Sequence, residues 1–222
     1  MANYATGEQT QEAILSAART LFYASGYKRT RCDQIAGEAN INPGLIHYHF
    51  KTKGNIALRI YSDYFQKIRN CVTEMFGDKN AALQAAIEVR ILWKLVEDDP
   101  NILRFFQEIA GDRIPQELSE QHGREYFVEL SKENPTETSE DMYRLLCICS
   151  IAMESELFLS CGSNQSPFSF TELSSLDIRS MFELLRFPPD VIQDVLQQSG
   201  EAVQQLDVFS SASFNIQVQR KA

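Results

Sequence analysis

The sequence predicts an all-α protein, and three observations support that prediction. Apolar residues recur with the period of an α-helix along almost the whole chain of 222 residues. No run alternates apolar and β-branched residues in the way a strand would. Turn-forming clusters such as "GDKN", "DDPN", "ENPTETS" and "GSNQSP" divide the pattern into about ten helices. With 44% hydrophobic residues, the chain is long enough for one large domain, or for a small domain attached to a larger one.

The first helix is expected at 10–25. Ile14, Ala17, Leu21 and Phe22 fall on one face of it at helical spacing. Gly26 follows the last residues of the pattern and provides the C-terminal stop. The amphipathic pattern indicates that this helix covers one side of a small core.

Two short helices follow, joined by the segment "ANIN". The first begins after Thr30, a suitable N-cap, and ends before Asn40, which tolerates the left-handed turn conformation. The second has Asn42 as its N-cap and Pro43 at its first position, and it runs to about residue 50. Two short helices with a third packed behind them form a helix-turn-helix, whose second helix enters the major groove of DNA.

Charge is distributed unevenly along the chain. The net charge of −9 would by itself disfavour nucleic acid, because phosphate neutralisation supplies most non-specific affinity. Residues 1–60, however, carry seven Lys or Arg against four Asp or Glu, whereas residues 61–222 carry 14 against 26. A basic N-terminal part on an acidic body indicates a protein that binds DNA with one end only. Chance scatter of surface charge is the alternative.

Residues 12–58 contain motifs that resemble those of a known protein family. The first helix ends in the pattern A-x-x-L-F-x-x-x-G-Y, and the next one contains I-A-x-x-A. The residues that carry the resemblance are Ala18, Leu21, Phe22, Gly26, Tyr27, Thr30, Ile35, Ala36, Ala39, Gly44, Ile46, His49, Phe50 and Lys53. With these residues the segment resembles the N-terminal domain of TetR-family transcriptional regulators. The resemblance implies a homodimeric regulator, and we expect a repressor that an unknown small-molecule effector releases from double-stranded operator DNA.

We predict that exposed residues of the second short helix, and basic residues around it, contact DNA. His47 and Tyr48 can hydrogen-bond phosphates or base edges, and Leu45 can pack on a thymine methyl group. Thr30 can offer its hydroxyl to a phosphate at a helix N-terminus, or it serves only as a cap. The lysines contact phosphates or are merely solvated. The predicted contacts are Thr30, Arg31, Asn42, Pro43, Gly44, Leu45, His47, Tyr48, Lys51 and Lys53.

Two features of the same helix limit what it can read. It holds no Arg, Lys or Gln among residues 43–50, and these are the usual bidentate readers of G and A. Specificity is therefore expected to rely on flanking arms, DNA shape and water. His49 falls on the inner side, where it is either a satisfied core histidine or a DNA contact.

The rest of the chain is expected to form a larger helical domain. A long helix at 53–76 spans the junction, with its apolar residues along one side. Further helices are expected near 80–97, 100–110, 115–132, 139–161, 171–186 and 189–206. We therefore divide the chain into a DNA-binding domain at 8–60, a helical effector-binding and dimerisation domain at 61–206, and a flexible tail at 207–222 that lacks a helical signal.

The segment 139–161 is apolar around most of its circumference, so it must be buried on several sides. We expect one side to face its own core and another to face a second copy of the chain, joined there by the helix that follows. This arrangement is a four-helix dimer interface. Its predicted contacts are Leu157, Met181, Leu184 and Leu185.

Aromatic residues of the larger domain are candidates for lining a small-molecule cavity, because such cavities are mostly apolar with a few polar groups. The candidates are Trp93, Phe105, Phe106, Tyr126, Phe127 and Tyr143. Glu156 is added to them because it projects into an apolar arc of its helix, where an unpaired carboxylate is costly. Its partner is either the effector or an interface arginine such as Arg179 or Arg186.

Other function classes have little support in the sequence. Five scattered cysteines without a CxxC pair predict neither a disulfide framework nor a metal site, and no cofactor is expected. A hydrolase could use Glu154, Glu156 or His122, but no nucleophile elbow or phosphate loop accompanies them. A helical protein-interaction module that has lost DNA binding is the other alternative. Without a long apolar run or a signal-like start, we expect no membrane contact and a cytoplasmic protein.

Overall fold

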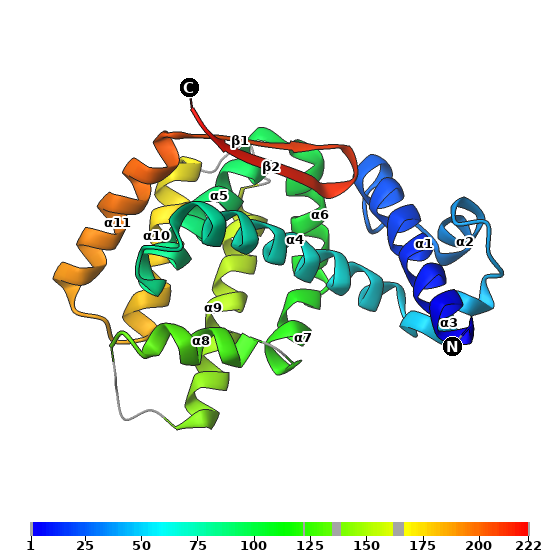
Figure 1. The fold of residues 1–222 in the computed structure, drawn as a ribbon, viewed down its shortest axis with the longest axis horizontal. Helices are drawn as coiled ribbons and strands as arrows, with labels where there is room; N and C mark the ends of the chain where they lie inside the picture. The colour runs from blue at the N-terminus through cyan, green and yellow to red at the C-terminus, as the bar shows by residue number, and fades with distance from the viewer. Residues whose placement is uncertain (1, 122, 135–138, 162–166, 222) are drawn as a thin grey trace.

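The computed structural model describes residues 2–121, 123–134, 139–161 and 167–221. It is mostly helical, as predicted, with a small N-terminal head beside a larger body (Figure 1). One long helix, α4 (Lys53–Phe76), runs from the head into the body. Within the described residues, no helix is long and apolar enough to cross a membrane.

The head consists of α1 (Ala2–Ser25), α2 (Cys32–Glu38) and α3 (Gly44–Phe50). Ile14 and Phe22 of α1, Ile35 of α2 and Ile46 of α3 are almost completely buried against one another and against the first turns of α4. These are the positions that the helical spacing predicted for the inner faces. The three helices therefore form the small core expected of a helix-turn-helix domain.

Helix α4 begins where the sequence predicted, at Lys53. The side chain of Thr52 caps it by accepting a hydrogen bond from the backbone N–H of Asn55 at 3.1 Å. Ile56 and Ile60 on its buried side face the head, and Ile68 and Val72 lie farther along the same side in the body. One continuous helix thus contributes to both cores.

The body contains the remaining helices of the described chain. They are α5 (Ala81–Asp98), α6 (Pro100–Gly111), α7 (Ile114–Gln121), α8 (Gly123–Ser131), α9 (Glu140–Ser160), α10 (Phe170–Leu184) and α11 (Pro189–Gln204). The single helix predicted at 115–132 is thus two, α7 and α8, and His122 between them lies outside the described residues.

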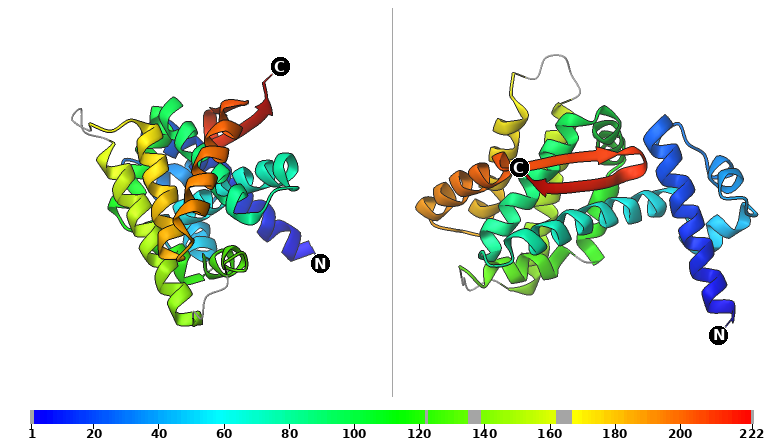
Figure 2. Two further views of the ribbon diagram at one scale, coloured as in Figure 1. Left: turned by 90° about the vertical axis from the view of Figure 1, so that its left-hand side faces the viewer. Right: turned by 45° about the horizontal axis from the view of Figure 1, so that its top comes forward.

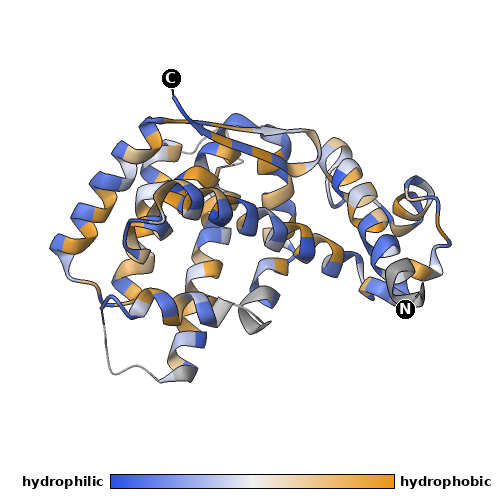
Figure 3. Ribbon diagram, in the orientation of Figure 1, coloured by the Kyte–Doolittle hydropathy of each residue, from blue (hydrophilic) through white to orange (hydrophobic). Residues whose placement is uncertain are grey.

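Helix α5 is the centre of the body. It packs against α4, α10 and α11, and most of its apolar residues, from Ala82 to Val96, are buried. The helices around it are amphipathic: hydrophilic and hydrophobic segments alternate along α4 and α11 (Figure 3). A buried central helix with amphipathic helices around it gives the body one continuous core.

The residues after α11 form a β-hairpin and not the flexible tail that we predicted for 207–222. Strand β1 (Leu206–Ser211) pairs antiparallel with β2 (Asn215–Arg220), and Val208 lies opposite Val218. The hairpin lies over α4 and α5, and its tip, the short turn η1 (Ala212–Phe214), reaches α1 (Figure 2). Each strand has only two inward apolar residues, so the alternation was too short to predict a strand.

Candidate functional site

Helix α3 presents an exposed face on the far side from its buried Ile46. The Tyr48 side chain is 71% exposed and that of Leu45 is 37% exposed. Ile46 anchors the helix to the head core, so the opposite face is free to contact another molecule. The predicted DNA-contact residues that do lie on the surface are Arg31, Asn42, Pro43, Gly44, Leu45, His47, Tyr48 and Lys51.

Both ends of α3 are fixed by local hydrogen bonds. At the start, the side-chain oxygen of Asn42 accepts from the backbone N–H of Gly44 at 2.9 Å, although α3 begins one residue later than predicted, with Pro43 and not Asn42 at the N-cap. At the end, Nδ1 of His47 lies 2.9 Å from the carbonyl oxygen of Lys51, whose φ of 66° turns the chain into α4. If Nδ1 donates to that oxygen, Nε2 is the ring nitrogen that can still contact DNA. His49, on the inner side, is half-buried and packs edge-on against the Tyr48 ring.

Thr30 and Lys53 do not have the exposed side chains that we predicted for phosphate contacts. Thr30 is only 2% exposed, and its hydroxyl donates to the carbonyl oxygen of Gly26 at 2.7 Å. The Lys53 ammonium donates to the carbonyl oxygens of Tyr27 at 2.8 Å and Thr30 at 2.9 Å, and it lies 4.2 Å from the centre of the Tyr27 ring. Both side chains therefore hold the loop between α1 and α2 in place. The correction has a simple reason: carbonyl groups left free at the end of α1 use these donors.

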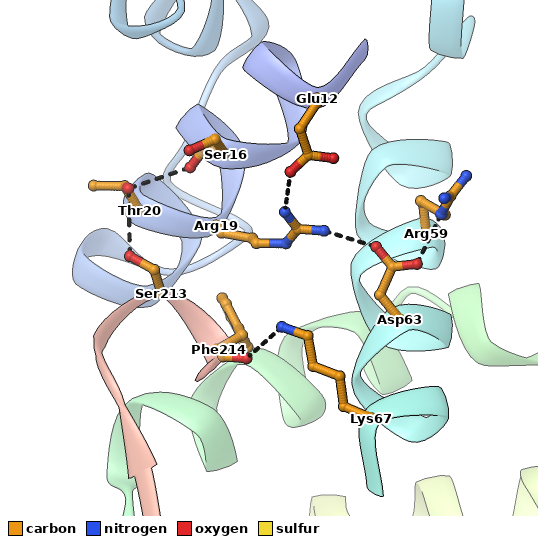
Figure 4. Close-up of polar contacts among 9 residues, drawn as sticks. All are labelled: Glu12, Ser16, Arg19, Thr20, Arg59, Asp63, Lys67, Ser213 and Phe214. Carbon is orange, nitrogen blue, oxygen red and sulfur yellow. Dashed lines mark hydrogen bonds and ion pairs between the residues drawn. The ribbon is translucent and has the colours of Figure 1, made fainter. Parts of the chain in front are cut away.

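The head is joined to the body by a network of charged side chains (Figure 4). Arg19 on α1 donates to Asp63 on α4 at 2.7 Å and to Glu12 at 2.8 Å. Arg59 also donates to Asp63, at 2.8 Å. Asp63 is only a quarter exposed, so it fixes α1 against the middle of α4.

Helix α6 makes a second junction with the head. Its Arg104 donates to the carbonyl oxygen of Tyr23 at 2.6 Å, and its Glu108 accepts from the backbone N–H of Lys28 at 2.8 Å. Gly26 lies directly over Glu108 with a φ of 89°, and an added Cβ there would lie 2.8 Å from the Glu108 carboxylate. Glycine is required at this position both for its backbone conformation and for the close approach of α6.

The tip of the C-terminal hairpin makes a third junction, which no pattern in the sequence predicted. The Phe214 ring is 1% exposed and packs against Phe105 of α6, at 4.7 Å between ring centres. Its carbonyl oxygen accepts from Lys67 of α4 at 3.3 Å, and Ser213 beside it lies within hydrogen-bond distance of Thr20 of α1 (Figure 4). The hairpin thus contacts the head and both helices that support it.

A cavity of about 200 Å³ lies in the body between α4, α5, α8, α9 and α10. Its aromatic wall consists of Tyr61 and Phe65 from α4 and Tyr126 and Phe127 from α8. Polar side chains complete the lining, mainly from α4, α5 and α9. A partly open space with an aromatic wall and several polar groups has the character of a small-molecule site.

Two of those polar side chains form an ion pair within the cavity wall. Arg69 on α4 places its Nε 3.4 Å from a carboxylate oxygen of Glu88 on α5, and its guanidinium lies 4.4 Å from the centre of the Tyr126 ring. Burial raises the pKa of Glu88, and the nearby Arg69 opposes that rise. Burial and the Glu88 carboxylate also raise the pKa of Tyr126, so its phenol stays protonated.

Glu154 on α9 is the third charged group of the cavity. Its carboxylate accepts a hydrogen bond from the Tyr61 hydroxyl at 3.1 Å. Asp177 on α10 is 4% exposed and accepts from the indole N–H of Trp93 at 2.9 Å. Burial raises the pKa of Glu154 well above its usual value, and Asp177 raises it further; burial raises the pKa of Asp177 to about 7. In the described part of the chain neither carboxyl group has an ion-pair partner.

Comparison with known proteins identifies the head. Residues 14–60 match the model of a family described as bacterial regulatory proteins, tetR family. The match covers α2, α3, the second half of α1 and the start of α4, so the head is similar to the DNA-binding domain of that family.

Solved structures extend the comparison to the body of this chain. RolR in complex with resorcinol is 16% identical, with a TM-score of 0.62 over 88% of this chain and 95% of that chain. RolR without ligand is 14% identical, with a TM-score of 0.60 over 85% of this chain and 96% of that chain. At such identities the likeness concerns the fold alone, and it confirms the predicted TetR-like arrangement of a helical body behind the head.

The cavity of the body uses only some of the residues predicted for it. Tyr126 and Phe127 line the cavity, whereas Phe105, Phe106 and Tyr143 are buried in the core and do not line it. Trp93 lines a separate, open groove beside Arg90. Residues that the sequence did not single out, Tyr61, Phe65, Arg69 and Glu88, supply much of the lining. They come from helices whose apolar faces looked like ordinary core.

Glu156 does not line the cavity, so the first alternative for it is wrong, while pairing with an interface arginine stays a prediction. Glu156 is exposed, and Glu154 two residues earlier is the buried carboxylate of α9. Glu156 does lie on an apolar arc, but that arc faces outward, where Leu145 is 51% exposed and Cys149 is also exposed. Periodicity identified the arc and could not show which side of α9 faces the core.

The interface residues are also corrected in part. Met181 is 5% exposed and Leu185 is 3% exposed, because both belong to the core of their own chain, and Met181 lines the cavity. Leu157 and Leu184 are half-buried. The exposed apolar residues of the same two helices are Met142, Leu145 and Leu159 on α9 and Leu176 on α10. The two helices do offer an apolar surface, but on a different face.

Proposed function

We propose that this protein is a ligand-responsive transcriptional regulator that acts as a homodimeric repressor and leaves its operator when a small molecule fills the cavity. The observation that carries the proposal is the exposed face of α3 in a head that matches the TetR family over residues 14–60. A buried inner face and a polar, aromatic outer face are what a recognition helix in the major groove requires.

DNA contacts are assigned to the residues that the structure exposes. Tyr48 and His47 face the groove from α3, with Leu45 able to meet a thymine methyl group. Arg31 at the start of α2 and Lys51 at the end of α3 contribute positive charge for phosphates on either side. Thr30 and Lys53 support these contacts indirectly, by fixing the loop before α2.

The dimer forms through the exposed apolar side chains of α9 and α10. Leu145 is 51% exposed and Leu176 is 46% exposed, and large apolar groups are usually buried in a functional assembly. Two helices from each copy form a four-helix interface. Such a dimer presents two heads to successive major grooves, whose centres lie about 34–36 Å apart or at a multiple of that distance.

The effector acts through α4. Tyr61 and Phe65 of the cavity wall lie on either side of Asp63, the residue that binds Arg19 of the head. Phe106 of α6 packs against Tyr61 at 5.6 Å between ring centres, and α6 also contacts the head through Arg104 and Glu108. A ligand that moves the aromatic wall therefore moves both supports of the head, and it changes the spacing of the two heads.

The size of the cavity limits the effector. Sites for drug-sized ligands span about 300–1,000 Å³, so a cavity of about 200 Å³ suits a smaller molecule. RolR, which shares the fold, was solved with resorcinol, a single aromatic ring. We propose an effector of comparable size for this chain.

The proposal is tested by selecting genomic DNA fragments on the immobilised protein and measuring affinity for the recovered sequence. We expect a short, two-fold symmetric operator that binds far more tightly than random DNA at the same salt concentration. The Tyr48→Ala variant is the matched control, since it should lose the selected sequences and keep its fold. Recovery of no common sequence, or equal recovery by Tyr48→Ala, contradicts a sequence-specific regulator.

A further inference from the structure

Glu154 in the lining of the cavity has no ion-pair partner among the described residues, and this bears on the effector that the proposed function assigns to the cavity. We infer that the effector is a small organic cation, a single-ring protonated amine, whose ammonium group pairs with Glu154 while the aromatic side chains of α4 and α8 enclose its ring. The inference rests on the proposed function only in taking the cavity as the effector site.

Charge balance within the cavity identifies Glu154 as the unpaired group. The guanidinium of Arg69 is matched by the Glu88 carboxylate 3.4 Å away. Glu154 receives one hydrogen bond, from the neutral Tyr61 hydroxyl. Asp177 is near enough to raise the pKa of Glu154, and it accepts one hydrogen bond from the neutral indole of Trp93. Among the described residues, half-buried Glu154 and buried Asp177 thus have no cationic partner, and removing carboxylates from water is costly unless a cation or a proton compensates.

The wall of the cavity is suited to a cation as well as to an aromatic ring. Tyr61, Phe65, Tyr126 and Phe127 supply ring faces and edges around the space. The negative face of an aromatic ring attracts a nearby ammonium group, and the attraction is strongest where water is excluded. A neutral ring would use the aromatic wall equally well, so the distinguishing group is the carboxylate.

Protonation of the Glu154–Asp177 pair predicts a measurable release of protons when a cation binds. Around neutral pH, burial and mutual repulsion keep a proton on the Glu154–Asp177 pair, since both pKa values are raised. A bound ammonium group favours the ionised form, so binding releases a proton and tightens as pH rises. The other titratable groups around the pair are Tyr61 and Arg69 of α4, Glu88 of α5, Tyr126 of α8 and Cys147 of α9. Burial raises the pKa values of the two phenols and the thiol, so these groups stay neutral.

The test compares molecules that differ only in charge. Phenethylamine and the neutral 2-phenylethanol are titrated into the full-length protein by calorimetry at pH 7, in two buffers of different ionisation enthalpy. We expect the amine to bind at least about tenfold more tightly, the gain of one favourable charge contact of about 1.4 kcal/mol, and to release up to one proton. Resorcinol is included as a neutral phenol that can donate hydrogen bonds to a carboxylate.

Variants of one helix provide the control. Glu154→Gln keeps the shape of the side chain and an oxygen for the Tyr61 hydroxyl, and it should abolish both the preference for the amine and the proton release. Glu156→Gln, two residues along α9 and exposed, should leave both unchanged. Proton release by the wild-type protein is a readout that needs no variant, so the test holds even if Glu154→Gln folds poorly.

Several outcomes would overturn the inference. One is that 2-phenylethanol or resorcinol binds as tightly as phenethylamine or more tightly. Others are that the amine binds without releasing a proton, or that Glu154→Gln keeps the preference for the amine. A last one is that none of phenethylamine, benzylamine and histamine binds. Operator affinity is measured separately. An amine that binds through Glu154 without changing operator affinity would contradict the proposed function and leave the cation site intact, whereas operator release by resorcinol alone would contradict only the cation.

Discussion

The head and the body of this protein place their charged groups in opposite ways. In the head, Arg31 and Lys51 are exposed, while the donors of buried Thr30 and half-buried Lys53 are satisfied by backbone carbonyl groups. In the body, Glu154 lines the cavity and Asp177 is buried, and within the described residues neither carboxyl group has an ion-pair partner. The head thus offers positive charge outward to a partner, whereas the body holds a protonated acid pair that a cationic ligand can ionise.

Polar contacts and one buried phenylalanine connect the head to the body. Arg19 binds Asp63 of α4, Arg104 of α6 binds the end of α1, and Phe214 of the hairpin fills the space between them. A change in the cavity can therefore reach the head without unfolding either region. The predictions below separate what the head does alone from what the body does for it.

The largest effect is expected at the dimer surface. Leu145→Asp places a charge in an interface that we propose to be apolar, so it should give monomers with unchanged helicity. Operator affinity should fall at least about 100-fold, because a lone head loses the second half-site. Sedimentation and fluorescence anisotropy measure the two effects.

Phe209→Asp is the control for this variant, since Phe209 is a similarly exposed apolar residue, at 41%, on the hairpin. It should remain dimeric. A Leu145→Asp protein that sediments as a dimer would move the interface elsewhere.

The next effect concerns the outward face of the head. Tyr48→Ala should weaken operator binding by about 1–3 kcal/mol, the usual cost of losing one good base or backbone contact. The melting temperature of the protein should not fall, because the Tyr48 side chain is 71% exposed. Lys51→Ala should also reduce the slope of log K against log salt by about 0.9 per half-site, whereas Tyr48→Ala should leave the slope unchanged. Equal slopes for Lys51→Ala and wild type would remove this lysine from the phosphate contacts.

The third prediction concerns Lys53, whose ammonium group binds backbone carbonyls within the head. Lys53→Met removes the two hydrogen bonds to Tyr27 and Thr30, and it should lower the stability of the head by about 1–3 kcal/mol. Hydrogen exchange should speed up in the loop before α2 and remain unchanged in α10. If the variant weakens DNA binding with no change in exchange, Lys53 is a phosphate contact after all.

A smaller effect is expected at the junction. Arg19 and Asp63 are partly buried, and a double-mutant cycle with Arg19→Ala and Asp63→Ala should give a coupling of about 1 kcal/mol in stability. The single variants should also reduce the loss of operator affinity that the effector causes. Full effector response in Arg19→Ala would show that the signal reaches the head by α6 or the hairpin instead.

The last effect is the pH dependence of stability. The pKa of Asp177 is raised to about 7 in the folded protein, so the native state binds more protons than the unfolded state between about pH 4 and pH 7. Stability should therefore decrease as pH rises through that range, apart from the contributions of other groups. Asp177→Asn should flatten this decrease, measured by urea denaturation at pH 5 and pH 7.5. An equally steep decrease in the variant would mean that Asp177 titrates normally.

The sequence predicted the helices and buried residues of the head more accurately than the packing of the body, and particular residues show why. The position of Tyr48 on α3 follows from local helix geometry, and the buried residues Ile35 and Ile46 follow from spacing. Thr30 and Lys53 were misassigned because their partners are backbone carbonyls 4 and 23–26 positions away, which a residue pattern does not reveal.

In the body, the missing information was which way each helix faces. Glu156 and Met181 were placed by periodicity on the correct helices, but α9 and α10 are apolar on more than one side, so the pattern did not select the inward one. The cavity adds to this difficulty, since Tyr61 and Phe65 look like core until the neighbouring helices are packed around them. The hairpin depends on contacts of Phe214 with residues more than a hundred positions earlier.

The central claim is that filling the acidic cavity lowers the affinity of the head for DNA, and one titration tests it directly. Operator affinity is measured by anisotropy with the cavity empty and with it saturated, and ligand affinity is measured for the free and the DNA-bound protein. We predict that both affinities fall by the same factor, about 5–150-fold, because the two binding events are thermodynamically linked. An operator affinity that stays the same when the cavity is saturated would contradict the account.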